Sequence, residues 1–167
     1  MRYMTLVGVL LFYGSAGLAQ VPPKDRVRTL YQKAVTDKNA AQKLIKLLKP
    51  YNSNHPLLLG YKASGIMLMA KHALNPFKKL KYFKEGKNIL QKAVEADKKN
   101  VELRLLRFAV QSNAPSFLGY DDHIQTDKEF LIENVPKLND DTLKSYIISY
   151  LESSSIGDTL QKKSGNY

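Results

Sequence analysis

Apolar residues recur at intervals of three and four through most of this 167-residue chain, and no stretch repeats them at every second position. The first spacing places apolar side chains on one face of an α-helix, whereas strict alternation would be typical of a half-buried strand. The sequence therefore predicts an all-α protein without a sheet. About seven helices are expected, at residues 25–37, 39–49, 56–74, 76–96, 101–112, 122–135 and 141–155.

Short polar side chains mark several of the expected helix starts. Asn39, Asn100 and Asp140 each precede an apolar-periodic segment, and Asp121 or Asp122 precedes another. Side chains of this type accept hydrogen bonds from the free N–H groups of a first helical turn. We therefore expect them to act as N-caps.

Two expected helices carry apolar residues around most of their circumference. The helix at residues 56–74 also contains Gly60 and Gly65, and glycine costs about 1 kcal/mol relative to alanine inside a helix. Retaining both glycines suggests that another helix packs there at close range. The helix at residues 101–112 has a single polar stripe and is expected to be sandwiched between other helices.

The first 19 residues have the layout of a secretory signal peptide. Arg2 precedes an apolar run at residues 6–13, and the small residues Gly17 and Ala19 come just before Gln20. The run is shorter than the roughly 20 residues that span a bilayer, so we expect cleavage after Ala19 and export to the periplasm or beyond the cell. A retained N-terminal anchor is the alternative.

The helical pattern after residue 19 predicts one domain, and its charge is unevenly distributed along the chain. One helical domain is expected at residues 20–155, followed by a flexible tail at residues 156–167. The formal charge of +11 is concentrated early, since residues 22–99 contain 18 Lys and Arg against 5 Asp and Glu, and residues 100–167 contain 7 against 10. Such a field favours anionic partners or simply keeps a protein soluble. Export argues against nucleic acid as the partner.

A run of lysines lies in the basic part, at Lys78, Lys79, Lys81, Lys84 and Lys87. At helical angles these side chains spread over more than half of the circumference. The run is therefore either an ordinary solvated surface or an anion-binding face.

The chain shows no recognisable catalytic or metal-binding motif. It has no cysteine, which excludes disulfides, thiolate metal sites and cysteine nucleophiles. HExxH, GxSxG, SxxK and phosphate-binding glycine loops are also absent, so we predict a non-enzymatic protein without cofactor or metal. Asp122, His123 and Asp127 form the only cluster of ligand-type residues, and capping explains its aspartates more simply.

Residues 90–108, LQKAVEADKKNVELRLLRF, resemble the end of a tetratricopeptide repeat (TPR). Leu90, Ala93, Asp97 and Asn100 match its large apolar residue, its alanine and its polar turn, whereas Lys98 replaces the usual proline. Residues 43–61 look like a weaker copy. The resemblance implies antiparallel helical hairpins stacked as a short α–α superhelix. The chain is also similar to a group of exported bacterial proteins that share the NPFKKLKY and LRF…PSFLGY stretches, which implies no particular activity.

In TPR stacks the first helix of each hairpin lines the concave surface, and the resemblance therefore implies a binding groove. We predict a module that binds a peptide or protein partner there. Arg104 and Arg107 would orient an acidic group and Tyr61 or Phe108 would supply apolar contact, with Gln111 on the same stripe as the arginines.

Three alternatives stay open at this point. The two arginines could instead pair inside the fold, for instance with Asp121, Asp122 or Glu102. The apolar loop with Phe117, Leu118 and Tyr120 could plug the next layer or stay exposed as a contact site. The basic part could bind an anionic lipid or glycan of the cell envelope, and higher ionic strength would abolish that binding while only weakening binding in an apolar groove.

Overall fold

The computed structural model describes the backbone of residues 21–164 and the side chains of residues 21–154. The expected signal peptide and residues 165–167 lie outside the described residues. The described part is helical and contains no strand, which confirms the prediction of an all-α helical-hairpin fold. Its elements are α1 (Lys24–Ala34), α2 (Lys38–Leu48), α3 (Pro56–His72), α4 (Pro76–Ala96), α5 (Val101–Ser112), η1 (Ser116–Leu118), α6 (Ile124–Asn134), η2 (Val135–Lys137) and α7 (Asp141–Ser164).

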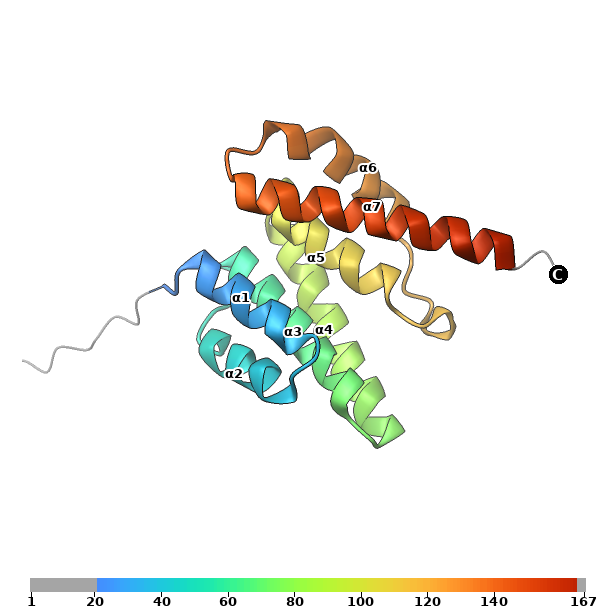
Figure 1. Cartoon of the computed structure of the whole chain (residues 1–167). Coiled ribbons are helices and arrows are strands. Elements are labelled where there is room, and N and C mark those ends of the chain that lie inside the picture. The colour runs from blue at the N-terminus through green and yellow to red at the C-terminus, as the bar shows by residue number, and fades with distance from the viewer. Residues whose placement is uncertain (1–20, 165–167) are drawn as a thin grey trace, which may run out of the picture.

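Neighbouring helices pack as hairpins, and α3 and α5 make most of the contacts between hairpins. α1 packs on α2, α3 packs on both α2 and α4, and α5 packs on α6, while α3 also contacts α1 and α5, α4 contacts α5, and α7 contacts α5. Figure 1 shows α6 and α7 lying on one side of α5, with the α3–α4 hairpin extending to the opposite end of the molecule. α3 and α5 are therefore the central helices of the fold.

Two large apolar clusters fill most of the interior of the described part, and a smaller one lies between α1, α2 and α3. The larger one surrounds α3 and includes the fully buried side chains of Leu44, Leu90 and Leu103, which come from α2, α4 and α5. The second holds α6 and α7 on the other side of α5, through residues such as Phe108 and Ile147. Because α5 supplies side chains to both clusters, it is sandwiched as the sequence predicts.

Helices approach closely at three glycines. A Cβ added at Gly60 would collide with the Leu103 side chain, and one added at Gly65 would lie 3.1 Å from Leu44 Cδ2. The expectation of close helix packing at both positions is confirmed. The tightest backbone contact lies at Gly86, where a Cβ would stand 2.8 Å from the carbonyl oxygen of Ala63.

Some of the expected helix starts are correct and others are wrong. Asn100 and Asp140 are caps, since their side chains accept hydrogen bonds from the N–H groups of Leu103 at 3.1 Å and Leu143 at 3.0 Å. α2 is capped by Asp37, which accepts from the Asn39 N–H at 2.7 Å, so Asn39 is already inside the first turn.

The start of α6 also differs from the expectation. Its N-cap is His123, and no side chain caps it, so neither Asp121 nor Asp122 has the expected role. A turn closed by the Ile124 N–H on the Asp121 carbonyl at 3.2 Å displaces the start of the helix to Ile124.

The last helix is longer than the sequence pattern predicts. α7 continues to Ser164, although the sequence pattern places the end of this helix near residue 155. Once a helix is nucleated, each further residue adds a hydrogen bond, and residues 156–164 contain no proline to stop it. Among the described residues, no helix has both the length and the apolar character that crossing a membrane requires.

Candidate functional site

The structure places most of the predicted site residues in the interior. Tyr61, Arg107, Phe108 and Gln111 are each no more than 5% exposed, and the side chain of Arg104 is 15% exposed. Phe108 belongs to the core between α5 and α7, where its ring packs edge-on against Tyr150 at 5.9 Å. These five residues do not together line an open groove, and partner binding through them stays a prediction.

The two arginines pair with Asp127 of α6. Asp127 is fully buried and accepts from Arg107 Nε at 2.7 Å and Nη2 at 2.8 Å, while Arg104 Nη1 lies 3.0 Å from its Oδ1. Arg104 also stacks over the Phe130 ring, with its Cζ 4.6 Å from the centroid. This group, the Asp127 cluster, joins α5 to α6 and differs from the pairing with Asp121, Asp122 or Glu102 considered above.

Gln111 and Tyr120 each bury a polar atom without a hydrogen-bond partner among the described residues. The Gln111 Oε1 accepts from the His123 N–H at 3.2 Å, but its Nε2 donates to nothing, and neither does the Tyr120 hydroxyl. Burial raises the pKa of Tyr120 to about 12. The Tyr120 ring packs edge-on against Phe83 at 5.6 Å.

The loop between α5 and α6 is buried at one residue and exposed at another, so each of the two alternatives given above holds for part of it. Tyr120 is 3% exposed and anchors the loop against α4, whereas Phe117 is 85% exposed. Leu118 is half-buried. The plug is therefore Tyr120, and Phe117 lies on the surface.

A second set of ion pairs centres on Arg28 of α1. Arg28 donates to Glu102 through Nε at 2.6 Å and Nη2 at 2.8 Å, and through Nη1 to Asp140 at 2.8 Å. The Tyr61 hydroxyl donates to the same Glu102 at 2.5 Å. This Arg28 cluster thus ties α1, α3, α5 and the start of α7 together. Sequence spacing does not indicate it, because its hydrogen-bonded pairs lie 41 to 112 positions apart.

The protonation states in the Arg28 cluster follow from its geometry. The hydrogen bond to Glu102 raises the pKa of Arg28, and burial together with the Glu102 charge raises the pKa of Tyr61. The Leu143 N–H and then Arg28 hold the pKa of Asp140 below its ordinary value. The Arg28 guanidinium and the Asp140 carboxylate are therefore charged at neutral pH, while Tyr61 stays a neutral donor.

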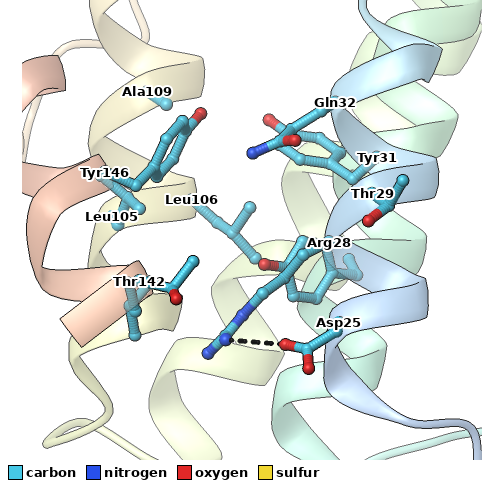
Figure 2. A pocket seen from close by; sticks show the side chains of 12 residues that line it. Asp25, Arg28, Thr29, Tyr31, Gln32, Leu105, Leu106, Ala109, Thr142 and Tyr146 are labelled. Atoms are coloured by element: carbon cyan, nitrogen blue, oxygen red, sulfur yellow. Dashed lines mark hydrogen bonds and ion pairs between the residues drawn. The ribbon is translucent and has the colours of Figure 1, made fainter. Parts of the chain in front are cut away.

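A cleft of about 200 Å³ opens beside this cluster. Figure 2 shows Tyr31 and Gln32 of α1 facing Tyr146 of α7 across it, with Leu106 of α5 between them and Arg28 at one end. Its lining is Asp25, Arg28, Thr29, Tyr31, Gln32, Tyr61, Leu105, Leu106, Ala109, Thr142, Leu143 and Tyr146. Every one of these residues lies on α1, α3, α5 or α7, and Tyr61 is the one predicted site residue among them.

A wider, shallower hollow lies between α1 and α2. Its volume is about 620 Å³, and its lining includes four cations, Arg26, Lys33, Lys43 and Lys46. Asp25 is the one carboxylate in that lining. The hollow is therefore a basic surface without an enclosed pocket.

The described residues offer no arrangement for metal chemistry. They contain no group of three or more His, Cys, Asp or Glu side chains that could share an ion. Of the cluster noted in the sequence, Asp127 is occupied by the two arginines. Comparisons with protein families, with characterised proteins and with solved structures gave no match for this chain.

Proposed function

We propose that this chain is a non-enzymatic interaction module that binds a peptide or protein partner in the cleft between α1 and α7. The observation that carries the proposal is the composition of the cleft. Its base is apolar and consists of Leu105, Leu106 and Ala109, and tyrosines line its two sides, Tyr31 on α1 and Tyr146 on α7. Tyr146 is 39% exposed although it is a large aromatic side chain beside this floor. Tyrosine combines a large apolar area with a polar tip and is enriched at protein interfaces.

The size of the cleft favours one side chain of a larger partner over a small free ligand. Sites for small molecules enclose roughly 300–1,000 Å³. A volume of about 200 Å³ is below that range, and the cleft is partly open to solvent. A single aliphatic or aromatic side chain, presented by a peptide, is the occupant that fits.

The charges at one end of the cleft indicate what should flank that side chain. Asp25, Glu102 and Asp140 surround the single guanidinium of Arg28, so the carboxylates outnumber it. A lysine or arginine next to the apolar anchor would find a favourable field there. This differs from the acidic peptide group expected when Arg104 and Arg107 were assigned to the groove.

The resemblance to TPR proteins supports the same location. In those stacks the first helix of each hairpin lines the concave surface, and here the cleft is lined only by the odd-numbered helices.

Export remains part of the proposal and rests on the N-terminal pattern of the sequence. Mass spectrometry of the chain purified from its native host would test it, because cleavage after Ala19 leaves Gln20 as the first residue.

Selection of peptides followed by a cleft-filling variant tests the function. Peptides selected from a random library on the purified protein should contain an apolar residue next to a basic one. Ala109→Phe fills the cleft from its floor and should weaken their binding at least tenfold, measured by fluorescence anisotropy. Phe117→Ser changes an exposed aromatic residue outside the cleft and should leave affinity unchanged. Equal binding to Ala109→Phe and to the unmodified protein would refute the proposal.

A further inference from the structure

The tip of the α3–α4 hairpin, residues 71–81, exposes three large apolar side chains close together. Leu74 is 98% exposed, Phe77 is 82% exposed and Leu80 is 41% exposed. Single apolar residues on a surface need no explanation, but a group of them within seven positions marks a contact site. Figure 1 shows this tip as the end of the hairpin that projects beyond the other helices. No described element covers it.

The tip is held in one conformation by its own sequence. Asn75 caps α4 by accepting from the N–H groups of Phe77 at 2.8 Å and Lys78 at 3.2 Å, and Pro76 occupies the first helical position. Further along, the close contact of Gly86 with Ala63 fixes α4 against α3. Leu74 and Phe77 are therefore presented outward by a preformed turn, and little conformational entropy is lost when a partner covers them.

The segment that contains these apolar side chains is strongly basic, and Glu85 is the first carboxylate after it. Between Lys38 and Lys84 the chain has ten lysines and no aspartate or glutamate. Lys78, Lys79 and Lys81 are exposed next to Phe77, and no ion pair or side-chain hydrogen bond within the described residues involves them. The tip thus combines exposed apolar side chains with neighbouring lysines that form no ion pair within the described residues.

We propose that this tip docks on an anionic lipid bilayer, with Leu74 and Phe77 entering the boundary between headgroups and acyl chains. The lysines would stay at the level of the lipid phosphates, since their long stems reach past apolar surface while the ammonium groups remain in water. Each lysine near an anionic surface strengthens binding by about fivefold, and the apolar side chains add a term that salt does not screen. A charged glycan would satisfy the lysines but offers no apolar layer for Leu74 and Phe77.

The absence of tryptophan makes a direct test simple. Phe77→Trp and Phe117→Trp in the full chain each give one tryptophan at a site where the native aromatic side chain is over 80% exposed. With phosphatidylglycerol vesicles at physiological ionic strength, tryptophan at position 77 should shift its emission to the blue and be quenched by brominated acyl chains. Tryptophan at position 117 should show neither change. The Phe117 variant also controls for binding through any other part of the chain.

Sedimentation with vesicles then separates the apolar and the charged contributions. Leu74→Ser with Phe77→Ser should reduce the partition coefficient about tenfold or more. Lys78→Gln, Lys79→Gln and Lys81→Gln together should reduce it about a hundredfold. The matched control removes the same charge from the hollow between α1 and α2, through Lys33→Gln, Lys43→Gln and Lys46→Gln, and should have a much smaller effect.

Several results would overturn the proposal. These are an absence of binding to phosphatidylglycerol vesicles, equal binding to pure phosphatidylcholine vesicles, and equal losses in the tip and the control lysine variants. Binding that survives Leu74→Ser with Phe77→Ser, or tighter binding to a sulfated polysaccharide than to vesicles, would instead indicate general attraction to anions by the basic half. Circular dichroism of every variant excludes misfolding as the cause of a loss.

Discussion

Replacing Asp127 by asparagine would leave two guanidinium groups inside the protein without a counter-charge. Asp127 is fully buried and pairs with both Arg107, which is 3% exposed, and Arg104, which is 15% exposed. The substitution keeps the size and shape of the side chain, so the change in stability reports on charge. We expect the variant to fold with a markedly lower free energy of unfolding.

The magnitude follows from the burial of the group. Removing one partner from a buried ion pair costs about 3–5 kcal/mol, because the remaining charge stays desolvated. Unfolding free energies of ordinary domains are about 5–15 kcal/mol, so the loss is a large fraction of the whole. For a domain of this size the melting temperature should fall by about 10 °C. Urea unfolding measures the free energy and thermal unfolding measures the melting temperature, both followed by circular dichroism.

Two further variants make this reasoning refutable. Glu133→Gln removes a carboxylate from the pair with Lys137, whose side chains are 73% and 62% exposed, and should cost about 0–1 kcal/mol. Arg104→Met, Arg107→Met and Asp127→Leu together remove every charge of the cluster and should restore most of the stability. A loss below about 1 kcal/mol for Asp127→Asn, or a triple variant as unstable as the single one, would refute the argument from desolvation.

Three other changes test separate features of the fold. Gly86→Ala should destabilise the protein by about 1–3 kcal/mol in urea, because the new Cβ would press on the Ala63 carbonyl oxygen. Gly65→Ala would meet side-chain atoms alone, Leu44 Cδ2 at 3.1 Å and Ile45 Cγ1 at 3.4 Å, and should be nearly neutral. Tyr120→Phe removes a buried hydroxyl that has no hydrogen-bond partner among the described residues, and should raise the free energy of unfolding by about 1 kcal/mol. Because burial raises the pKa of Tyr120 to about 12 in the folded state, the unmodified protein should lose stability between about pH 10 and 12, and the variant should lose less. The pKa of Asp140 is lowered in the folded state, so Asp140 stabilises the fold above the ordinary aspartate pKa, and this stabilisation is lost as the pH falls below about 4. The free energy of unfolding should therefore fall less steeply with decreasing pH in Asp140→Asn than in the unmodified protein.

Local spacing was sufficient to predict the helical elements. Apolar stripes gave the fold class and the central places of α3 and α5, and Pro76 and Asn100 located helix starts. The errors lie at positions where two neighbouring residues could serve the same purpose, as with Asp37 and Asn39 at the start of α2. Leu80 has the helical spacing of the buried face of α4 but is 41% exposed, because this end of the hairpin extends past the helices that would cover it.

The candidate site could be predicted only in small part. A polar stripe on an apolar helix indicates that Arg104 and Arg107 need partners, but it does not say which carboxylate a distant helix supplies. Asp127 was noted for its spacing from His123, and its pairing with Arg107 depends on how α6 lies on α5. The cleft itself combines residues from four helices, and no pattern within one segment indicates such a combination.

The contact between Arg28 and Asp140 spans 112 positions and connects the first helix to the last. In a simple row of helical repeats each unit touches only its neighbours, so the two ends open independently and unravel first. Here the same guanidinium holds both ends, and Glu102 beneath it belongs to a central helix. The Arg28–Asp140 pair thereby adds a link between α1 and α7 to the packing of neighbouring helices, so that loosening either helix removes one support of the other.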